Sequence, residues 1–183
     1  MKTLIINGSP RKNGDTAALI EYLKEYLLGE INEIRTYDSN ISPCIDCRAC
    51  RIKQGCSIED EMQNVYNYLE GCDNVVIASP LYFTELTGSL LNVGSRLQTY
   101  FSAHYFRKEE PLLSRKKGAV ILTGGGSSGC DNAYKTAACL LKSMNVQDIF
   151  PVIFCGNTDF KPAKENKNIL KDIRRAAEFL SNP

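Results

Sequence analysis

The sequence predicts an α/β domain in which helices cover both faces of a five-stranded parallel sheet. Short apolar runs alternate with amphipathic segments along the whole chain, which is the pattern of repeated strand–helix units. The strongest of these runs are apolar at every position, as expected for strands that are covered on both faces. The length of 183 residues suits one such domain, so we expect residues 1–183 to form a single unit.

The expected strands differ in strength, and this difference predicts their order. Residues 3–6, 75–78 and 119–122 are continuously apolar, whereas 31–37 includes polar residues. Residues 149–154 include Pro151, which has no N–H for a strand ladder and favours an edge position. With the strong strands in the centre and the weak ones at the edges, the sheet takes the doubly wound, flavodoxin-like order 2-1-3-4-5.

Amphipathic segments between these strands predict the helices. Apolar residues recur at helical spacing within 19–27, 62–69 and 169–180, and residues 88–103 and 131–144 also indicate helices. The remaining segment, 38–58, is unusually long for a loop in a compact domain. Such loops usually carry function.

Composition excludes several classes of partner. The charged residues balance to a net charge of +1, which predicts neither nucleic-acid binding nor attraction to an anionic membrane. No apolar stretch approaches the roughly 18 residues of a membrane span. The first apolar run is also too short for the core of a signal peptide. We therefore expect a soluble, cytoplasmic protein.

Eight cysteines are many for this length, and four of them are clustered as C-x2-C-x2-C-x5-C, at Cys44, Cys47, Cys50 and Cys56. Clustered cysteines in the cytosol more often hold metal or carry out redox chemistry than form disulfides. The scattered ones are expected to be small core residues, namely Cys72, Cys130, Cys139 and Cys155.

The loop after the first strand has the features of a phosphate site. Gly8 and Gly14 allow close approach of the backbone, Ser9 and Thr16 offer hydroxyl groups, and Arg11 offers a guanidinium. Neither a dinucleotide fingerprint nor a P-loop is present. The alternative is an ordinary strand–helix turn, capped by Asp15 or Asn13.

Three motifs resemble those of the NADPH-dependent FMN reductase and iron–sulfur flavoprotein superfamily over nearly the full chain. They are Gly8-Ser9-Pro10-Arg11-x-Asn13-Gly14-x-Thr16, Pro43-Cys44-x2-Cys47-x2-Cys50 with Gly55-Cys56-x3-Asp60-x-Met62, and Ser79-Pro80-Leu81-Tyr82-Phe83 with Leu86-Thr87-Gly88. The resemblance implies FMN as cofactor, NAD(P)H as co-substrate and a homodimer or higher assembly. It also implies FMN contacts from the first loop, at Ser9, Arg11, Asn13, Asp15 and Thr16.

Two further loops follow expected strands at the same end of the sheet and suit the flavin ring. An isoalloxazine ring needs flat apolar contact and nearby backbone donors, which Pro80, Leu81, Tyr82 and Phe83 could provide. Thr123, Gly124, Gly125 and Gly126 permit close backbone approach and unusual φ values. The alternatives are core packing for the two aromatic residues and a flexible linker for the three glycines.

The sequence allows three interpretations of the cysteine segment: a [4Fe–4S] cluster, a zinc ion or free thiols. Three closely spaced cysteines with a fourth nearby can hold a [4Fe–4S] cluster. Zinc usually takes two separated pairs, and free thiols without metal are the third reading.

These features predict an FMN-dependent NAD(P)H oxidoreductase that uses ping-pong hydride transfer through flavin N5 and needs no catalytic side chain. The acceptor would be a small molecule or a protein. One alternative is an electron carrier that passes electrons between FMN, a cluster and protein partners without a substrate of its own. Another is a non-enzymatic zinc- or thiol-dependent binding module. Abundant apolar and aromatic residues in 81–106 also predict a homodimer.

Overall fold

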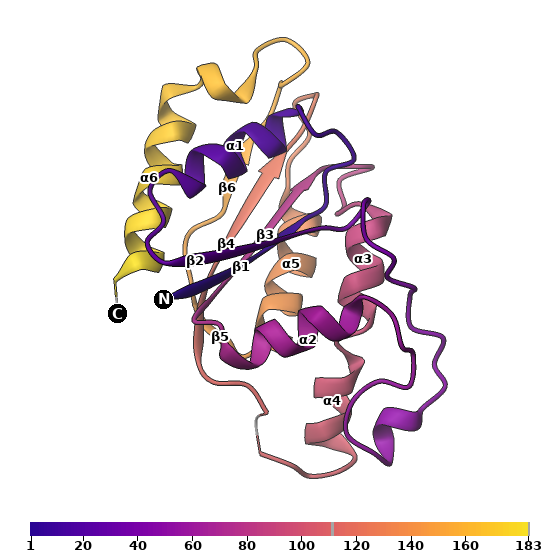
Figure 1. The fold of residues 1–183 in the computed structure, drawn as a ribbon. Helices are drawn as coiled ribbons and strands as arrows, with labels where there is room; N and C mark the ends of the chain where they lie inside the picture. Colours follow the sequence, from indigo (N-terminus) through magenta and orange to yellow (C-terminus); the bar gives the residue numbers. More distant parts are fainter. Residues whose placement is uncertain (111, 183) are drawn as a thin grey trace.

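The computed structural model describes residues 1–110 and 112–182, and its strands form one parallel sheet. They are β1 (Lys2–Asn7), β2 (Glu30–Arg35), β3 (Asn74–Pro80), β4 (Lys116–Thr123), β5 (Val146–Ile149) and β6 (Ile153–Cys155). The order is β2-β1-β3-β4-β5, with β6 also paired to β4 (Figure 1). This confirms the flavodoxin-like order expected from the sequence.

Helices cover both faces of the sheet, as the alternating pattern predicted (Figure 1). One face carries α1 (Asp15–Lys24) and α6 (Lys167–Ser181). The other carries α2 (Met62–Gly71), α3 (Gly88–Ser95) and α5 (Asp131–Ser143). A further helix, α4 (Gln98–Tyr105), follows α3, and two short 3-10 turns are η1 (Ala49–Arg51) and η2 (Ala163–Glu165).

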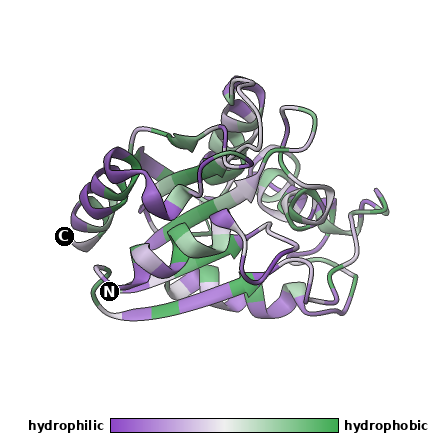
Figure 2. Ribbon diagram, turned by 90° about the horizontal axis from the view of Figure 1, so that it is seen from above, coloured by the Kyte–Doolittle hydropathy of each residue, from purple (hydrophilic) through white to green (hydrophobic). Residues whose placement is uncertain are grey.

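Two apolar layers form the core, one on each face of the sheet. Successive side chains of a strand point to opposite faces, so Leu4 and Ile6 belong to the layer under α2, α3 and α5. Ile5, between them, packs in the layer under α1 and α6. Figure 2 shows the apolar strands at the centre of the molecule and polar residues toward the outer faces of the helices. Burial on both faces explains why the central strands are continuously apolar.

Two elements differ from the prediction, each for an identifiable physical reason. The expected strand 149–154 is divided into β5 and β6, because Pro151 lies between them and cannot donate to β4. The expected helix 88–103 is divided into α3 and α4 around Arg96. The carbonyl of Arg96 accepts a hydrogen bond from the hydroxyl of Tyr66 at 2.7 Å, in the place of a helical N–H.

The long segment 38–58 runs along the outside of the molecule and brings η1 beside α4 (Figure 1). The other three loops of interest, 7–15, 79–87 and 123–130, follow β1, β3 and β4 at the carboxyl edge of the sheet. Ligands of open α/β sheets bind at this edge. Among the described residues, no helix combines the length and the apolar character that a membrane crossing requires.

Candidate functional site

The loop after β1 is held in shape by a buried asparagine. The side chain of Asn7 accepts a hydrogen bond from the backbone N of Ser9 at 2.8 Å. It also donates to Glu33 on β2 at 2.7 Å. Glu33 is in turn paired with Lys24 of α1. Burial opposes the charge of Glu33, but the hydrogen bonds from Asn7 and Lys24 outweigh it and lower the pKa of this carboxyl. The loop therefore rests on a polar network that joins β1, β2 and α1.

The end of this loop presents the N-terminus of α1 without a side-chain cap. Gly14 is the N-cap residue, and no side chain accepts from the first amides of the helix. A Cβ added to Gly14 would lie 3.1 Å from Cβ of Arg11 and 3.3 Å from its Nε. The exposed Arg11 side chain thus lies over the entrance of α1. Uncapped amides and a guanidinium together suit a phosphate.

Ser9, Asn13 and Asp15, which were also expected to contact the phosphate, differ in exposure and in hydrogen-bond partners. Ser9 is buried, and its hydroxyl donates to the carbonyl of Arg11 at 3.0 Å. Asn13 is exposed. The carboxylate of Asp15 accepts a hydrogen bond from the backbone N of Ala163 at 2.7 Å and so caps η2. The pattern had grouped Asp15 with the phosphate contacts, but its carboxylate is engaged by this distant backbone N–H. One oxygen of the Asp15 carboxylate is therefore engaged by a backbone N–H outside the loop.

A hydrogen bond between two threonines joins the first loop to the loop after β4. Thr16 and Thr123 are buried, and their hydroxyl oxygens lie 2.7 Å apart. The backbone carbonyl of Thr123 also accepts from the N of Leu81 at 2.8 Å. Three loops that are far apart in sequence are therefore bonded to one another at the carboxyl edge of the sheet.

The loop after β3 ends in a tight turn that displays an aromatic residue. Pro80 is the last residue of β3, and Leu81 is half-buried. Tyr82 and Glu85 exchange two backbone hydrogen bonds, at 2.9 and 3.0 Å. The two residues between them have positive φ, 52° at Phe83 and 65° at Thr84. This is the backbone of a type I′ turn, which favours glycine or asparagine.

The unusual turn is held by α5. The carbonyl of Thr84 accepts from the N of Ala133 at 3.2 Å, and the carboxylate of Glu85 accepts from the hydroxyl of Thr136 at 3.0 Å. The Phe83 side chain is 101% exposed and the Tyr82 side chain 47% exposed. Core packing, the alternative for these two aromatic residues, is therefore wrong for Phe83. A strained turn that exposes an aromatic ring is typical of a binding site.

The glycine loop after β4 is fastened to residues that follow β6. The N of Gly124 donates to the carbonyl of Cys155 at 2.9 Å, and the N of Asn157 donates to the carbonyl of Gly126 at 2.8 Å. A Cβ on Gly125 would lie 2.3 Å from the carboxylate of Asp159. The flexible-linker alternative is therefore wrong. None of the three glycines has a positive φ, and close approach requires a glycine only at position 125, since a Cβ on Gly126 would have no atom within 4 Å.

Residues 155–159 are the part of this edge that sequence reasoning missed. Only their position after the last strand could have indicated them. They contribute backbone partners, and the hydroxyl of Thr158 donates to the carbonyl of Gly124 at 3.2 Å.

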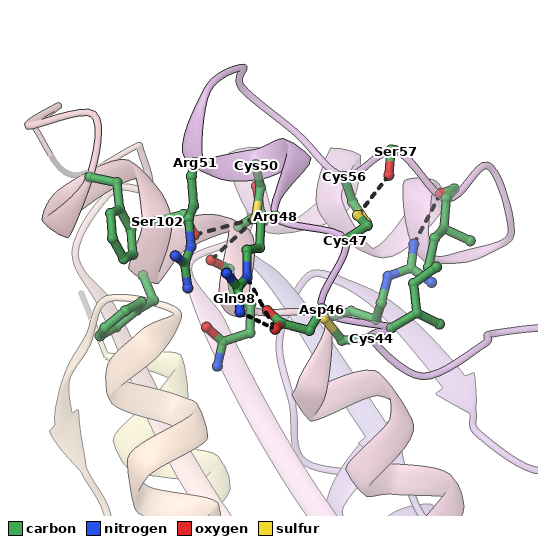
Figure 3. A pocket seen from close by; sticks show the side chains of 16 residues that line it. Cys44, Asp46, Cys47, Arg48, Cys50, Arg51, Cys56, Ser57, Gln98 and Ser102 are labelled. Carbon is green, nitrogen blue, oxygen red and sulfur yellow. Dashed lines mark hydrogen bonds and ion pairs between the residues drawn. The ribbon is translucent and has the colours of Figure 1, made fainter.

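The four clustered cysteines line a common pocket between the segment 38–58 and α4 (Figure 3). Its volume is about 50 Å³. Cys47 and Cys50 have hydroxyl partners, Ser57 at 3.2 Å and Ser102 at 3.3 Å. The bond with Ser57, together with the backbone N–H of Ala49, lowers the pKa of the Cys47 thiol. The four thiols are free, and within the described residues no three histidine, cysteine or acidic side chains are grouped as ligands of one metal ion.

The scattered cysteines are only partly as expected. Cys72 and Cys155 are buried, and burial raises the pKa of both thiols. Cys130 is half-buried, while Cys139 is exposed on α5. The core assignment is thus wrong for Cys139, because its position on α5 faces away from the sheet.

A buried ion pair closes the two ends of the cysteine segment. Arg96 donates to Asp60 at 2.7 Å, to the carbonyl of Ser42 at 2.9 Å and to the carbonyl of Ile58 at 3.0 Å. The exposed fractions of the Arg96 and Asp60 side chains are 0% and 6%. Burial opposes the charge of Asp60, but Arg96 and the amides of Ser42 and Met62 outweigh it and lower the pKa of this carboxyl. One guanidinium thus holds both ends of the stretch that carries the four thiols.

Comparisons with known proteins agree with this geometry. A sequence model of the NADPH-dependent FMN reductase family matches residues 1–159. An iron–sulfur flavoprotein of Archaeoglobus fulgidus is 33% identical, over 98% of this chain and 94% of the relative. An iron–sulfur flavoprotein of Clostridioides difficile is 36% identical, over 97% of this chain and 75% of the relative. The solved structure of an FMN-dependent NADH-azoreductase from Bacillus anthracis in complex with FMN has a TM-score of 0.74 and 17% identity, covering 100% of both chains. This last likeness shows a shared fold.

Proposed function

The chain belongs to the NADPH-dependent FMN reductase family, and on that basis we propose that it is an FMN-dependent NAD(P)H oxidoreductase. Family membership confirms the resemblance that the sequence motifs indicated. The observation that carries the proposal is the bonding of the three loops at the carboxyl edge, through Thr16, Thr123 and Leu81. FMN would supply the redox chemistry there, by ping-pong hydride transfer from NAD(P)H through flavin N5.

The residues present fit a flavin mononucleotide. The uncapped N-terminus of α1 and Arg11 would hold one phosphate, with hydroxyl support from Thr16. The turn at Tyr82 and Phe83 and the glycine loop would hold the ring. Asn7 and Glu33 would keep the phosphate loop in shape without touching the ligand.

Titration of the apoprotein with FMN and with riboflavin tests the phosphate assignment. FMN should bind more tightly, because only FMN carries the phosphate. Arg11→Ala should weaken FMN binding by about ten- to a hundredfold and leave riboflavin unchanged, since a charge-assisted hydrogen bond is removed. Lys12→Ala is the matched control, because this neighbouring cation is paired with Asp38. Equal affinity of the wild type for both ligands would contradict the assignment.

Anaerobic mixing of the FMN-loaded protein with NADH or NADPH distinguishes the enzyme from an electron carrier. Bleaching of the flavin absorbance by either nucleotide supports the enzyme. Reduction by a protein donor alone would favour the carrier, which would pass electrons between FMN, a cluster and a partner.

Cys44, Cys47, Cys50 and Cys56 are the proposed ligands of a [4Fe–4S] cluster. Support comes from the shared pocket and from the iron–sulfur flavoproteins to which the chain is similar. Iron and acid-labile sulfide should be measured after anaerobic reconstitution, with Cys50→Ser against Cys139→Ser as the matched pair. Loss of iron in the first variant alone is expected. A wild type that takes up no iron would leave zinc or free thiols as the alternatives.

The proposal includes a cytoplasmic homodimer. Its eight free cysteines are consistent with a reducing compartment. Leu86, Leu90 and Val93 are part of the core, so exposed aromatic residues remain as the candidate contact: Tyr82, Phe83, Phe101, Tyr105 and Phe106. A monomer mass by light scattering of the FMN-loaded protein, over a wide concentration range, would contradict this assignment.

A further inference from the structure

Two buried polar atoms, in residues that line the cysteine pocket, have no hydrogen-bond partner. They are Nε of Arg96 and the hydroxyl oxygen of Thr99, in residues that are 1% and 4% exposed. Buried donors without a partner are rare, because burial removes their water and the loss is not compensated. Two more such atoms occur among the described residues, on Thr36 and Tyr68, and neither of these residues lines the pocket.

The other groups of the Arg96 side chain are already used. Both terminal nitrogens donate to the ends of the cysteine segment, at Asp60, Ser42 and Ile58. These bonds fix the plane of the guanidinium, and the direction of the Nε–H follows from that plane. The free donor is therefore oriented by the same contacts that close the cysteine segment.

Thr99 lies in the sequence between two other hydroxyl residues, Ser95 and Ser102. Thr99 and Ser102 are three positions apart within α4, which places them on one side of that helix, whereas Ser95 is the last residue of α3. The outer two contact the cysteine segment. Ser95 accepts from the N of Cys44 at 3.0 Å, and Ser102 lies 3.3 Å from the sulfur of Cys50. The hydroxyl between them is the one without a partner.

The surroundings of these two donors favour a negatively charged acceptor. Arg48 and Arg51 also line the pocket, together with one carboxylate, Asp46, which is paired with Arg48 at 3.2 Å (Figure 3). Arg51 lies over the ring of Phe106 at 4.2 Å, and among the described residues it has no ion pair with a carboxylate. The other chemical groups in the pocket are mainly thiols. A thiolate-bound iron–sulfur group is anionic and offers sulfur acceptors, whereas zinc held by the same thiols offers fewer.

We propose that Arg96 through Nε and Thr99 through its hydroxyl donate hydrogen bonds to sulfur atoms of an iron–sulfur group held in the cysteine pocket. This inference rests on the proposed function, and it gives both residues a direct influence on the reduction potential of that group. Reduction adds negative charge to the sulfur atoms, so donors stabilise the reduced form and raise the potential.

Thr99→Val tests the proposal with Thr36→Val as the matched control. Both changes remove a buried hydroxyl without a partner and keep the shape of the side chain. In the metal-free protein both should therefore raise the urea midpoint. After anaerobic reconstitution, both should keep the iron, sulfide and FMN contents of the wild type.

The reduction potential separates the two variants. In an anaerobic redox titration followed by low-temperature EPR, Thr99→Val should lower the equilibrium constant for reduction about tenfold. For one electron this is a shift of about 59 mV to lower potential. Thr36→Val should keep the potential of the wild type. Arg96→Lys retains the positive charge but lacks Nε, and its loaded fraction should show a lower potential as well.

The outcomes distinguish this inference from the function on which it rests. A wild type that loads iron, with Thr99→Val and Thr36→Val at equal potentials, would overturn the inference for Thr99 and leave the cluster in place. Equal reduction potentials of Arg96→Lys and the wild type would overturn the inference for Arg96 and leave the cluster in place. A wild type that takes up no iron would overturn both the cluster and the donors.

Discussion

Asp60→Asn should destabilise the fold far more than the loss of an exposed carboxylate. Asp60 and Arg96 form a buried pair at 2.7 Å. Loss of one partner of such a pair costs about 3–5 kcal/mol, because the other charge stays buried. In Asp60→Asn, Arg96 still donates to two backbone carbonyls, so we take the lower end of this range, about 3 kcal/mol, as the cost of losing the charge pair. Asparagine has one acceptor oxygen where Asp60 serves the amides of Ser42 and Met62 with two, a further loss of about 1 kcal/mol.

The assay is urea unfolding of the metal-free protein at neutral pH. With an m value of about 2 kcal/mol per molar urea, a loss of about 4 kcal/mol lowers the midpoint by about 2 M. Asp148→Asn is the control, since its pair with Arg115 lies 2.9 Å apart on the surface with side chains 44% and 70% exposed. Its midpoint should fall by less than about 0.5 M. Equal shifts in the two variants would refute the reasoning.

The pH dependence of the same pair has a defined sign. The pKa of Asp60 is lowered from its ordinary value of 3.8, so the folded state favours the ionised form. Its contribution is complete above that ordinary value and is lost as the pH falls through the lowered one. The difference in stability between wild type and Asp60→Asn should therefore shrink only in acid, below about pH 4.

Three further predictions concern the loops at the carboxyl edge. The pKa of Glu33 is lowered, so the folded state favours its ionised form. The urea midpoint of the wild type should therefore exceed that of Glu33→Gln at neutral pH, and this difference should disappear as the pH falls below 4.5. A constant difference down to pH 3 would contradict this. Phe83→Gly should relieve a positive φ of 52° and raise the free energy of unfolding by about 1 kcal/mol, while FMN titration should show weaker binding. Gly8→Ala should cost about 1–3 kcal/mol, because its Cβ would lie 2.8 Å from Leu90 and Thr87; Gly71→Ala, with no atom within 4 Å, should not.

The sequence predicted the secondary structure correctly where the physical role of a residue follows from its type alone. Continuous apolar runs predicted β1, β3 and β4 because both of their faces are buried, and Pro151 correctly indicated a weak edge. The interruption between α3 and α4 was not predictable from local pattern. It involves the hydrogen bond from the hydroxyl of Tyr66, 30 residues earlier in the chain, to the carbonyl of Arg96.

The candidate site shows the same division. Glycines, hydroxyl residues and Arg11 after β1 predict a phosphate loop, because this chemistry lies in side chains and in the start of a helix, and this assignment stays a prediction. The partner of the Asp15 carboxylate is the backbone N of Ala163, and most of the bonds between the glycine loop and residues 155–159 join backbone groups, which every residue has. No pattern of side chains can indicate which distant backbone group will be the partner.

The hydrogen bond between Thr16 and Thr123 links the directions in which the two hydroxyl groups donate their protons. The two hydroxyl oxygens are 2.7 Å apart, and either one can be the donor. One of the two hydroxyl protons lies between the oxygens. The hydroxyl that accepts this proton can donate its own proton to a third group. A phosphate that accepts the proton of Thr16 obliges Thr16 to accept from Thr123. The phosphate then determines the direction of a hydroxyl 107 residues further along the chain, next to the glycine loop. Phosphate binding at one end of the proposed flavin site would thereby set the direction of a hydrogen bond at the other end, without movement of a single heavy atom.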